Sequence, residues 1–290
     1  MTAAAYLACA LIWGTTWFAI RVCIGPGGYP TLAGAALRFL IAGTIVAVLT
    51  VWARPRPNVR QSAWLLFCGL LNAISYGCIY FAEERIPGGL TAVLYCTAPL
   101  MMAIVASLTR AEQVSPRQLG GAIVALLGVL FIFWERFAVS SSQGVGVALV
   151  LGSVLTSSVY NVIYKRHAKD VHPIASTALF LGTTAIVMGI VALAVEHKPL
   201  PWPWPVKPTL ALLYLAIVGS VIAFVSYFYL LQRVSLMTAT TLVFLQPLIA
   251  LCADALWEEQ IRILPRTYAG AALTLCGVAS SLLWRKHAAR

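Results

Sequence analysis

The chain has 290 residues, of which 61% are hydrophobic and only 10% are charged, and its mean hydropathy is +0.88. Soluble globular domains are closer to half apolar and a quarter charged. A soluble fold of this length could not bury so much apolar surface. The composition therefore excludes a soluble protein and predicts one whose surroundings are mostly lipid.

Long apolar runs divide the chain from end to end. A helix crosses the ~30 Å hydrocarbon core of a bilayer with about 20 apolar residues. Runs of about that length occur near 3–22, 31–53, 61–82, 88–108, 116–134, 144–164, 173–195, 208–231, 236–256 and 265–284. They are too long and too continuously apolar for barrel strands. We therefore predict an all-α integral membrane protein with ten transmembrane helices, the first of which lacks the basic start of a signal peptide.

The formal net charge of +11 has an explanation that does not involve nucleic acid. Cytoplasmic loops of membrane proteins carry an excess of Lys and Arg. With the ten runs in place, twelve Lys and Arg residues fall on the side of the N-terminus and seven on the opposite side. This imbalance predicts cytoplasmic N- and C-termini. The expected partners are the lipid bilayer and a small molecule, with no nucleic acid.

An internal repeat relates the two halves of the chain. A shift of 148 residues places Arg85 on Arg233 and Pro99 on Pro247. We predict two five-helix repeats, residues 1–139 and 140–290. Because five is odd, the second repeat must enter the membrane from the opposite side. Such inverted repeats are typical of secondary transporters.

Two prolines interrupt matching runs of this repeat. Pro99 and Pro247 each prevent a backbone hydrogen bond to the carbonyl four residues earlier, that of Tyr95 or Val243. Freed carbonyls must face protein or water, because lipid offers them no donor. We predict that both prolines are hinges beside a polar notch at the centre of the membrane. The alternative is a pair of simple kinks satisfied by neighbouring helices.

Aromatic and amide side chains in the middle of several runs are the candidate substrate-binding residues. Aromatic residues near the ends of membrane helices usually belong to interfacial belts, but this set lies deeper, where cavity lining and plain packing are the alternatives. The predicted set is Trp17, Asn72, Tyr76, Tyr80, Tyr95, Tyr160, Asn161, Phe224 and Gln246. No acidic residue lies near the centre of a run, so we expect a neutral, aromatic cavity.

Arg38 is the one basic residue that lies deep inside a predicted span. Charged residues within the membrane are functional candidates, yet an arginine can also extend its head group to the interface. We favour a structural anchor over binding of a substrate carboxylate. No histidine or cysteine spacing indicates a metal site, a catalytic residue or a cofactor.

Glycines mark the fifth and tenth runs at related positions. A shift of 149 residues places Gly121 on Gly270 and Gly128 on Gly277. Small residues let membrane helices approach closely. We predict that these two helices pack together, away from the transport path.

Four segments together carry a family resemblance: LIWGTTWFAIR, ALRFLIAG, TAPLMMAI and QPLIALCADALWEEQ. They resemble the EamA-type drug/metabolite transporter superfamily, and the chain is similar to its bacterial aromatic amino-acid exporter branch (YddG-like). The resemblance covers nearly the whole chain. It implies a ten-helix fold with a central cavity and efflux of amino acids or related metabolites.

These observations predict an inner-membrane secondary transporter. We expect it to export amino acids, aromatic ones included, by alternating access, and to function as a monomer. The alternative is export of drugs or other small metabolites on the same scaffold. An intramembrane enzyme would need a buried catalytic dyad or a metal cluster, and a channel would need a ring of filter residues; neither pattern is visible in the sequence.

Overall fold

The structure is a computed structural model that describes residues 1–51, 57–86, 88–133, 143–249 and 265–283. All regular elements within these ranges are helical, which confirms the predicted all-α class. Seven helical segments are long and apolar enough to cross a membrane, and three shorter apolar helices accompany them at Pro116–Ile132, Leu236–Ile249 and Ala269–Leu282. The chain is therefore a multi-pass membrane protein.

The helices of the first half follow the predicted runs closely. They are α1 (Thr2–Ile24), α2 (Thr31–Thr50), α3 (Val59–Glu83), α4 (Gly88–Tyr95), α5 (Ala98–Leu108) and α6 (Pro116–Phe133). The run predicted at 88–108 is two helices rather than one, because the chain leaves the helical path at Cys96 and Thr97. Pro99 lies in the first turn of α5, where a proline costs no helical hydrogen bond.

The second half is less regular. Its elements are α7 (Gly144–His167), α8 (Pro173–Val195), α9 (Val206–Ala216), the π-helix η3 (Ile217–Ile222), α10 (Ala223–Leu231), α11 (Leu236–Thr240), the 3₁₀-helix η4 (Thr241–Phe244) and α13 (Pro265–Leu283). The run predicted at 208–231 thus changes helix type in its middle. The run predicted at 236–256 tightens just before Pro247, and its part after residue 249 lies outside the described residues.

Local chemistry explains where several helices begin. Asn58 accepts a hydrogen bond from the backbone N–H of Gln61, and the Gln61 side chain accepts one from the backbone of Asn58. This reciprocal arrangement satisfies two donors at the start of α3. Ser235 caps α11 in a similar way through the backbone N–H of Thr238.

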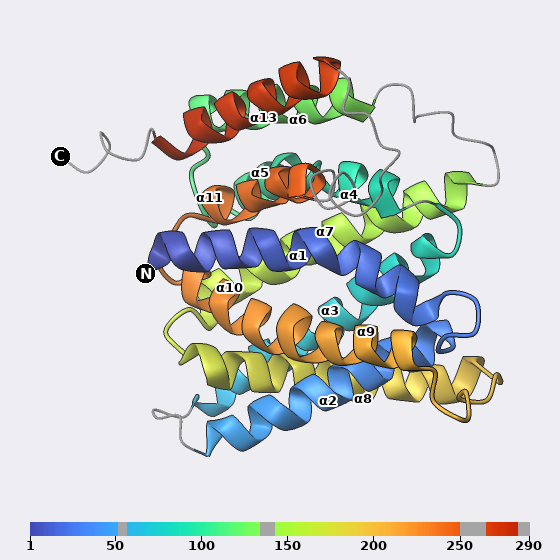
Figure 1. Ribbon diagram of the computed structural model, residues 1–290. Coiled ribbons are helices and arrows are strands. Elements are labelled where there is room, and N and C mark those ends of the chain that lie inside the picture. The colour runs from blue at the N-terminus through green and yellow to red at the C-terminus, as the bar shows by residue number, and fades with distance from the viewer. Residues whose placement is uncertain (52–56, 87, 134–142, 250–264, 284–290) are drawn as a thin grey trace.

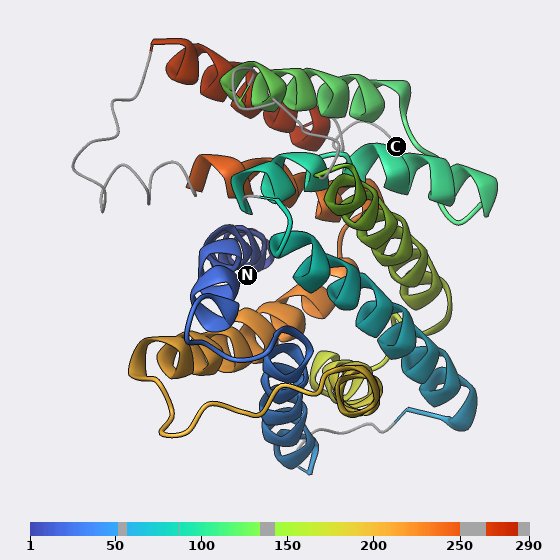
Figure 2. The ribbon, with the colours of Figure 1, turned by 90° about the vertical axis from the view of Figure 1, so that its right-hand side faces the viewer.

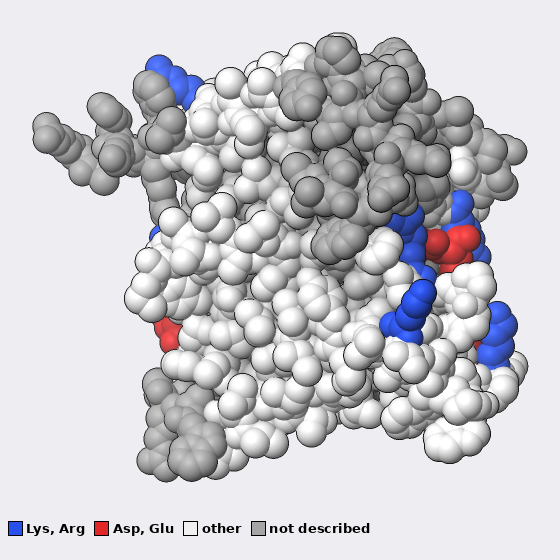
Figure 3. Space-filling model, in the orientation of Figure 1, with Lys and Arg blue, Asp and Glu red and all other residues white. Residues whose placement is uncertain are grey.

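The outer surface is apolar along much of the helices. Large hydrophobic side chains such as Phe18, Ile186 and Leu193 are exposed, which in water would be an aggregation hazard. Figure 3 shows one face of the molecule, on which the charged side chains of the described residues lie toward the two ends of the helices and leave a broad uncharged middle. This pattern fits a helix bundle surrounded by lipid.

Helices α6 and α13 form a separate layer at one side of the molecule, seen at the top of Figures 1 and 2. The α-carbons of Gly121 and Gly277 face each other's backbone, as do those of Gly128 and Gly270. A methyl group on Gly277 would lie 2.4 Å from the backbone nitrogen of Ala125. The predicted close packing of these two helices is confirmed, and none of these glycines lines the cavity described below.

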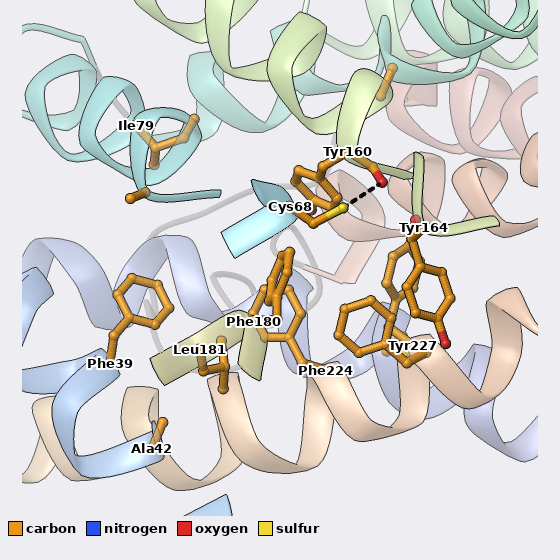
Figure 4. Packing of buried hydrophobic residues seen from close by; sticks show 14 of the residues in the cluster. Phe39, Ala42, Cys68, Ile79, Tyr160, Tyr164, Phe180, Leu181, Phe224 and Tyr227 are labelled. Carbon is orange, nitrogen blue, oxygen red and sulfur yellow. Dashed lines mark hydrogen bonds between the residues drawn. The ribbon is translucent and has the colours of Figure 1, made fainter. Parts of the chain in front are cut away.

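The main core lies below this layer and is rich in aromatic rings. Phe180 of α8 packs against Phe224 of α10, with ring centroids 5.3 Å apart, and against Tyr160 of α7 at 5.2 Å. Figure 4 shows these rings together, with Tyr164 and Tyr227 farther along the same cluster. Segments far apart in sequence therefore share one core, and the cavity opens beside it.

Candidate solute-binding site

A cavity of about 70 Å³ lies in the interior. Helices α1, α3, α5, α7, α10 and α11 contribute to its wall, together with the end of α4 and the segment of η4 that leads to Pro247. Its lining residues are Trp13, Thr16, Trp17, Ile20, Ser75, Tyr76, Ile79, Tyr95, Ala98, Met102, Ser157, Ser158, Tyr160, Asn161, Phe224, Tyr227, Ala239, Thr240, Leu242, Val243 and Gln246. None of these side chains is charged.

Most of the predicted binding residues meet at this cavity. They are Trp17, Tyr76, Tyr95, Tyr160, Asn161, Phe224 and Gln246. They come from both halves of the chain, so the fold brings together positions more than 200 residues apart.

Asn72 and Tyr80 are the two predicted binding residues that do not line the cavity. Both are fully buried. The Asn72 amide donates a hydrogen bond to the hydroxyl of Thr184 at 3.0 Å and so ties α3 to α8. Tyr80 lies close to the buried Arg38. Their positions are those of packing residues behind the wall.

Aromatic rings form much of the wall. The centroids of Trp17 and Tyr95 are 5.6 Å apart. Trp13 meets Phe224 at 5.6 Å and Tyr227 at 4.9 Å, both in edge-to-face geometry. Such spacings are favourable for aromatic pairs. The wall is therefore suited to contact with an apolar or aromatic group.

A few polar atoms interrupt the aromatic surface. The indole N–H of Trp17 donates to Oε1 of Gln246 at 3.2 Å, which links α1 to the segment of Pro247. Nε1 of Trp13 and Oδ1 of Asn161 are buried without a hydrogen-bond partner. Buried polar atoms are nearly always paired, so one free donor and one free acceptor at a cavity indicate a polar ligand or water.

The break before Pro99 contacts the 3₁₀-helix η4, just before Pro247, beside the cavity. The thiol of Cys96, at the break before Pro99, donates to the carbonyl of Val243 at 3.5 Å. Val243 carries the carbonyl that Pro247 frees. The thiol also lies 3.3 Å from the carbonyl of Ala92. The break in the first half is therefore bonded to the 3₁₀ segment of the second half.

The binding residues predicted from the sequence did not include Trp13 and Tyr227, which also line the cavity. Trp13 lies one turn before Trp17 on the same face of α1, which is a usable signal. Tyr227 is related by the shift of 148 residues to Ile79, which also lines the cavity. Comparing the apolar positions of the two repeats, and not only the aromatic ones, would have identified Tyr227.

A buried, uncharged cavity enclosed by membrane helices fits a membrane transporter, and the relatives of the chain are named transporters rather than enzymes. The chain belongs to the EamA-like transporter family, whose model matches residues 1–134 and 144–283. The family resemblance stated from the sequence is thereby confirmed.

Similar proteins cover most of the chain. The uncharacterized transporter YoaV of Bacillus subtilis is 26% identical over 92% of this chain and 92% of its own length. The uncharacterized inner membrane transporter YedA of Escherichia coli is 28% identical over 85% and 79%. A protein named probable terminal-alkyne amino-acid exporter, from Streptantibioticus cattleyicolor, is 26% identical over 92% and 88%.

The fold also matches a solved structure. A crystal structure of another protein superposes with a TM-score of 0.78 and covers 97% of this chain and 96% of the other, at 19% sequence identity. At that identity the match concerns the fold alone.

Proposed function

We propose that the protein is an inner-membrane secondary transporter that exports amino acids, aromatic ones included, by alternating access. The observation that carries this proposal is the composition of the cavity. Its wall is aromatic and uncharged, and it holds one unpaired donor on Trp13 and one unpaired acceptor on Asn161. The ring of an aromatic amino acid would contact the aromatic wall, and its polar groups would pair with Trp13 and Asn161.

The name of one relative supports the same substrate class. The Streptantibioticus protein is named for an amino acid with an apolar, unsaturated side chain. A cavity that accepts such a side chain needs apolar walls, and this chain has them. Trp17, Tyr76, Tyr95, Tyr160 and Phe224 are assigned to the side chain of the solute, and Asn161 and Gln246 to its polar end.

An inverted repeat of ten helices, residues 1–139 and 140–290, is part of the proposal. Support comes from positions 148 residues apart that both line the cavity. These pairs are Tyr76 and Phe224, Ile79 and Tyr227, Tyr95 and Val243, and Ala98 and Gln246. Two halves that contribute equivalent positions to one central site are what an inverted repeat requires.

The size of the cavity fits a closed state. A water molecule needs ~10–15 Å³ of such space, so about 70 Å³ holds a few waters, whereas ligand pockets measure about 300–1,000 Å³. An amino acid enters when the helices part. The break before Pro99 and the 3₁₀ segment before Pro247 are the assigned hinges, because these two irregular stretches meet beside the cavity through Cys96 and Val243.

The proposed setting follows from the relatives and from charge. YedA is named an inner membrane transporter, and the excess of Lys and Arg on the side of the termini assigns both termini to the cytoplasm. A monomer is the proposed functional unit.

The test is uptake of labelled phenylalanine, leucine and alanine into proteoliposomes that contain the purified protein. Counterflow that is saturable and fastest for phenylalanine is the expected result, and Trp17→Ala is expected to weaken it. Empty liposomes and a variant at an exposed position outside the cavity, Lys169→Ala, are the controls. Uptake of a cationic dye but of no amino acid would refute the amino-acid assignment and favour drug export.

A further inference from the structure

Arg38 of α2 is fully buried, with 0% of its surface exposed. It does not extend to the interface, as the snorkelling alternative requires. Burying a charged group is costly unless the charge is paired and hydrogen-bonded. The surroundings of Arg38 therefore decide whether it is only an anchor.

The π-helix η3 holds one edge of the guanidinium. Nε donates to the hydroxyl of Ser220 at 2.9 Å, and Nη2 donates to the carbonyl of Gly219 at 3.1 Å. Ser220 in turn donates to the carbonyl of Leu215 at 2.9 Å. The wide turn of a π-helix leaves backbone carbonyls available that an α-helix would use internally. This edge is the anchor that the sequence suggests.

The other edge of the guanidinium is unsatisfied. An arginine has five N–H donors, and Nη1 has no partner in hydrogen-bonding geometry. The phenols of Tyr76 and Tyr80 lie within reach of the guanidinium, with the thiol of Cys23 beyond them, but the Tyr80 hydroxyl is likewise without a partner in bonding geometry. No carboxylate among the described residues neutralises the charge. Stacking on the rings of Phe39 and Tyr76, at 5.1 and 5.0 Å, stabilises the cation but leaves it unpaired.

Only one layer of side chains separates this cation from the cavity. Tyr76 lines the cavity on one side and stacks on Arg38 on the other. Thr16 also lines the cavity and packs near Gly219, close to Nη2 of Arg38. Tyr76 is half-buried while Arg38 is inaccessible, so a movement of the Tyr76 ring is what would expose the charge.

We infer that Arg38 binds the carboxylate of the transported solute through its free Nη1 edge, after the Tyr76 ring moves aside. The inference rests on the proposed amino-acid transport and deepens it by assigning the anionic end of the solute. A carboxylate matches the two parallel N–H groups at the Nη1 and Nη2 edge of a guanidinium. The unpaired Oδ1 of Asn161 remains an acceptor for the ammonium group. Solutes with a free carboxylate are then selected over the corresponding amides and amines.

The experiment compares labelled phenylalanine with phenylalaninamide and phenethylamine in proteoliposomes. The wild-type protein is expected to favour the acid over the amide by at least about tenfold, the range of one hydrogen bond to a charged group. Arg38→Met is expected to abolish this preference. Arg60→Met, which removes an exposed arginine at the start of α3, is the matched control and is expected to keep it.

Further outcomes separate this inference from the proposed function. A folded Arg38→Met protein with the wild-type preference overturns the role of Arg38 and leaves amino-acid transport standing. If Arg38→Met does not fold, Arg38→Lys carries the test, because one ammonium cannot hold both the η3 contacts and a carboxylate. Its preference is expected to fall, and a wild-type preference overturns the inference. Wild-type protein that takes up none of the three compounds refutes amino-acid transport and this inference with it.

Discussion

Trp17 contributes two different groups to the cavity. Its ring lies 5.6 Å from that of Tyr95, and its N–H donates to Gln246. The second contact joins α1 to the segment that contains Pro247. Trp17 therefore positions Gln246 in addition to its proposed contact with the solute.

The Trp17→Phe variant separates these two roles. It keeps an aromatic ring but leaves Oε1 of Gln246 without its donor. Losing one neutral hydrogen bond costs about 1 kcal/mol, so we expect KM for phenylalanine to rise about fivefold with a smaller change in maximal rate. Initial uptake rates over a range of concentrations measure this. An unchanged KM in a folded variant would show that the contact with Gln246 does not matter for binding.

The depth of the aromatic residues could be predicted from the sequence, but their direction could not. Tyr76 faces the cavity, whereas Tyr80 faces Arg38. Residues four apart in an α-helix differ by about 40° around the axis, and here that angle separates the cavity from the core. Asn72 lies one turn nearer the start of α3, where α8 covers it. A single sequence does not contain the position of α8.

At the scale of elements, the broken helices are the features most directly connected to movement. The break before Pro99 and the 3₁₀ segment before Pro247 touch through Cys96 and Val243. We expect alanine at Pro99 or Pro247 to favour a continuous helix and to slow transport about tenfold, which corresponds to ~1.4 kcal/mol in the barrier to switching. Counterflow rates measure the effect, and equal amounts of inserted protein confirm the comparison. Wild-type rates in both variants would remove the hinges from the mechanism.

The glycine contacts between α6 and α13 make a separate prediction about stability. A methyl group on Gly277 meets the backbone of Ala125 and of Gly121 at 2.4 and 2.6 Å, and a backbone cannot move aside as a side chain can. We expect Gly277→Ala to destabilise the protein by roughly 1–3 kcal/mol, the usual cost of overpacking. Thermal unfolding in detergent measures it.

Gly120 supplies the matched control for this prediction. It is the neighbour of Gly121 on α6, and an added methyl group there meets nothing within 4 Å. We expect Gly120→Ala to be neutral or slightly stabilising, because alanine favours a helix over glycine. Equal losses in the two variants would attribute the effect to helix propensity rather than to the contact.

At the scale of the whole molecule, the proposed inverted repeat predicts on which side of the membrane each loop lies. The loop between α1 and α2 and the loop between α7 and α8 occupy equivalent places in the two proposed repeats. We expect a cysteine at Pro26, in the first loop, to react with a membrane-impermeant maleimide in intact cells. A cysteine at Lys169, in the second loop, is expected to react only after the cells are opened. The wild-type protein gives the background of its native cysteines, and labelling of both positions from one side contradicts inversion.

Much of the architecture follows from hydropathy alone, because lipid requires each span to be apolar and helical. The starts of α2, α6, α7, α8 and α13 agree with the starts of the predicted runs. The change of helix type at Ile217–Ile222 could not be predicted in this way. An apolar run has the same composition whether its backbone is α-helical or π-helical, and what distinguishes them is the contact with Arg38.

The π-helix η3 determines in which direction the side chains after it point. In an α-helix each residue advances the side-chain direction by about 100°. A π-turn holds one extra residue, and the residues after it keep the direction they would have if that residue were absent. Phe224 and Tyr227 follow η3 and point into the cavity. If residues 217–222 adopted regular α-helical turns without losing a residue, both rings would turn by about 100°, whereas deleting one residue there would restore a regular helix with both rings still facing the cavity. The π-turn therefore sets the direction in which Phe224 and Tyr227 face.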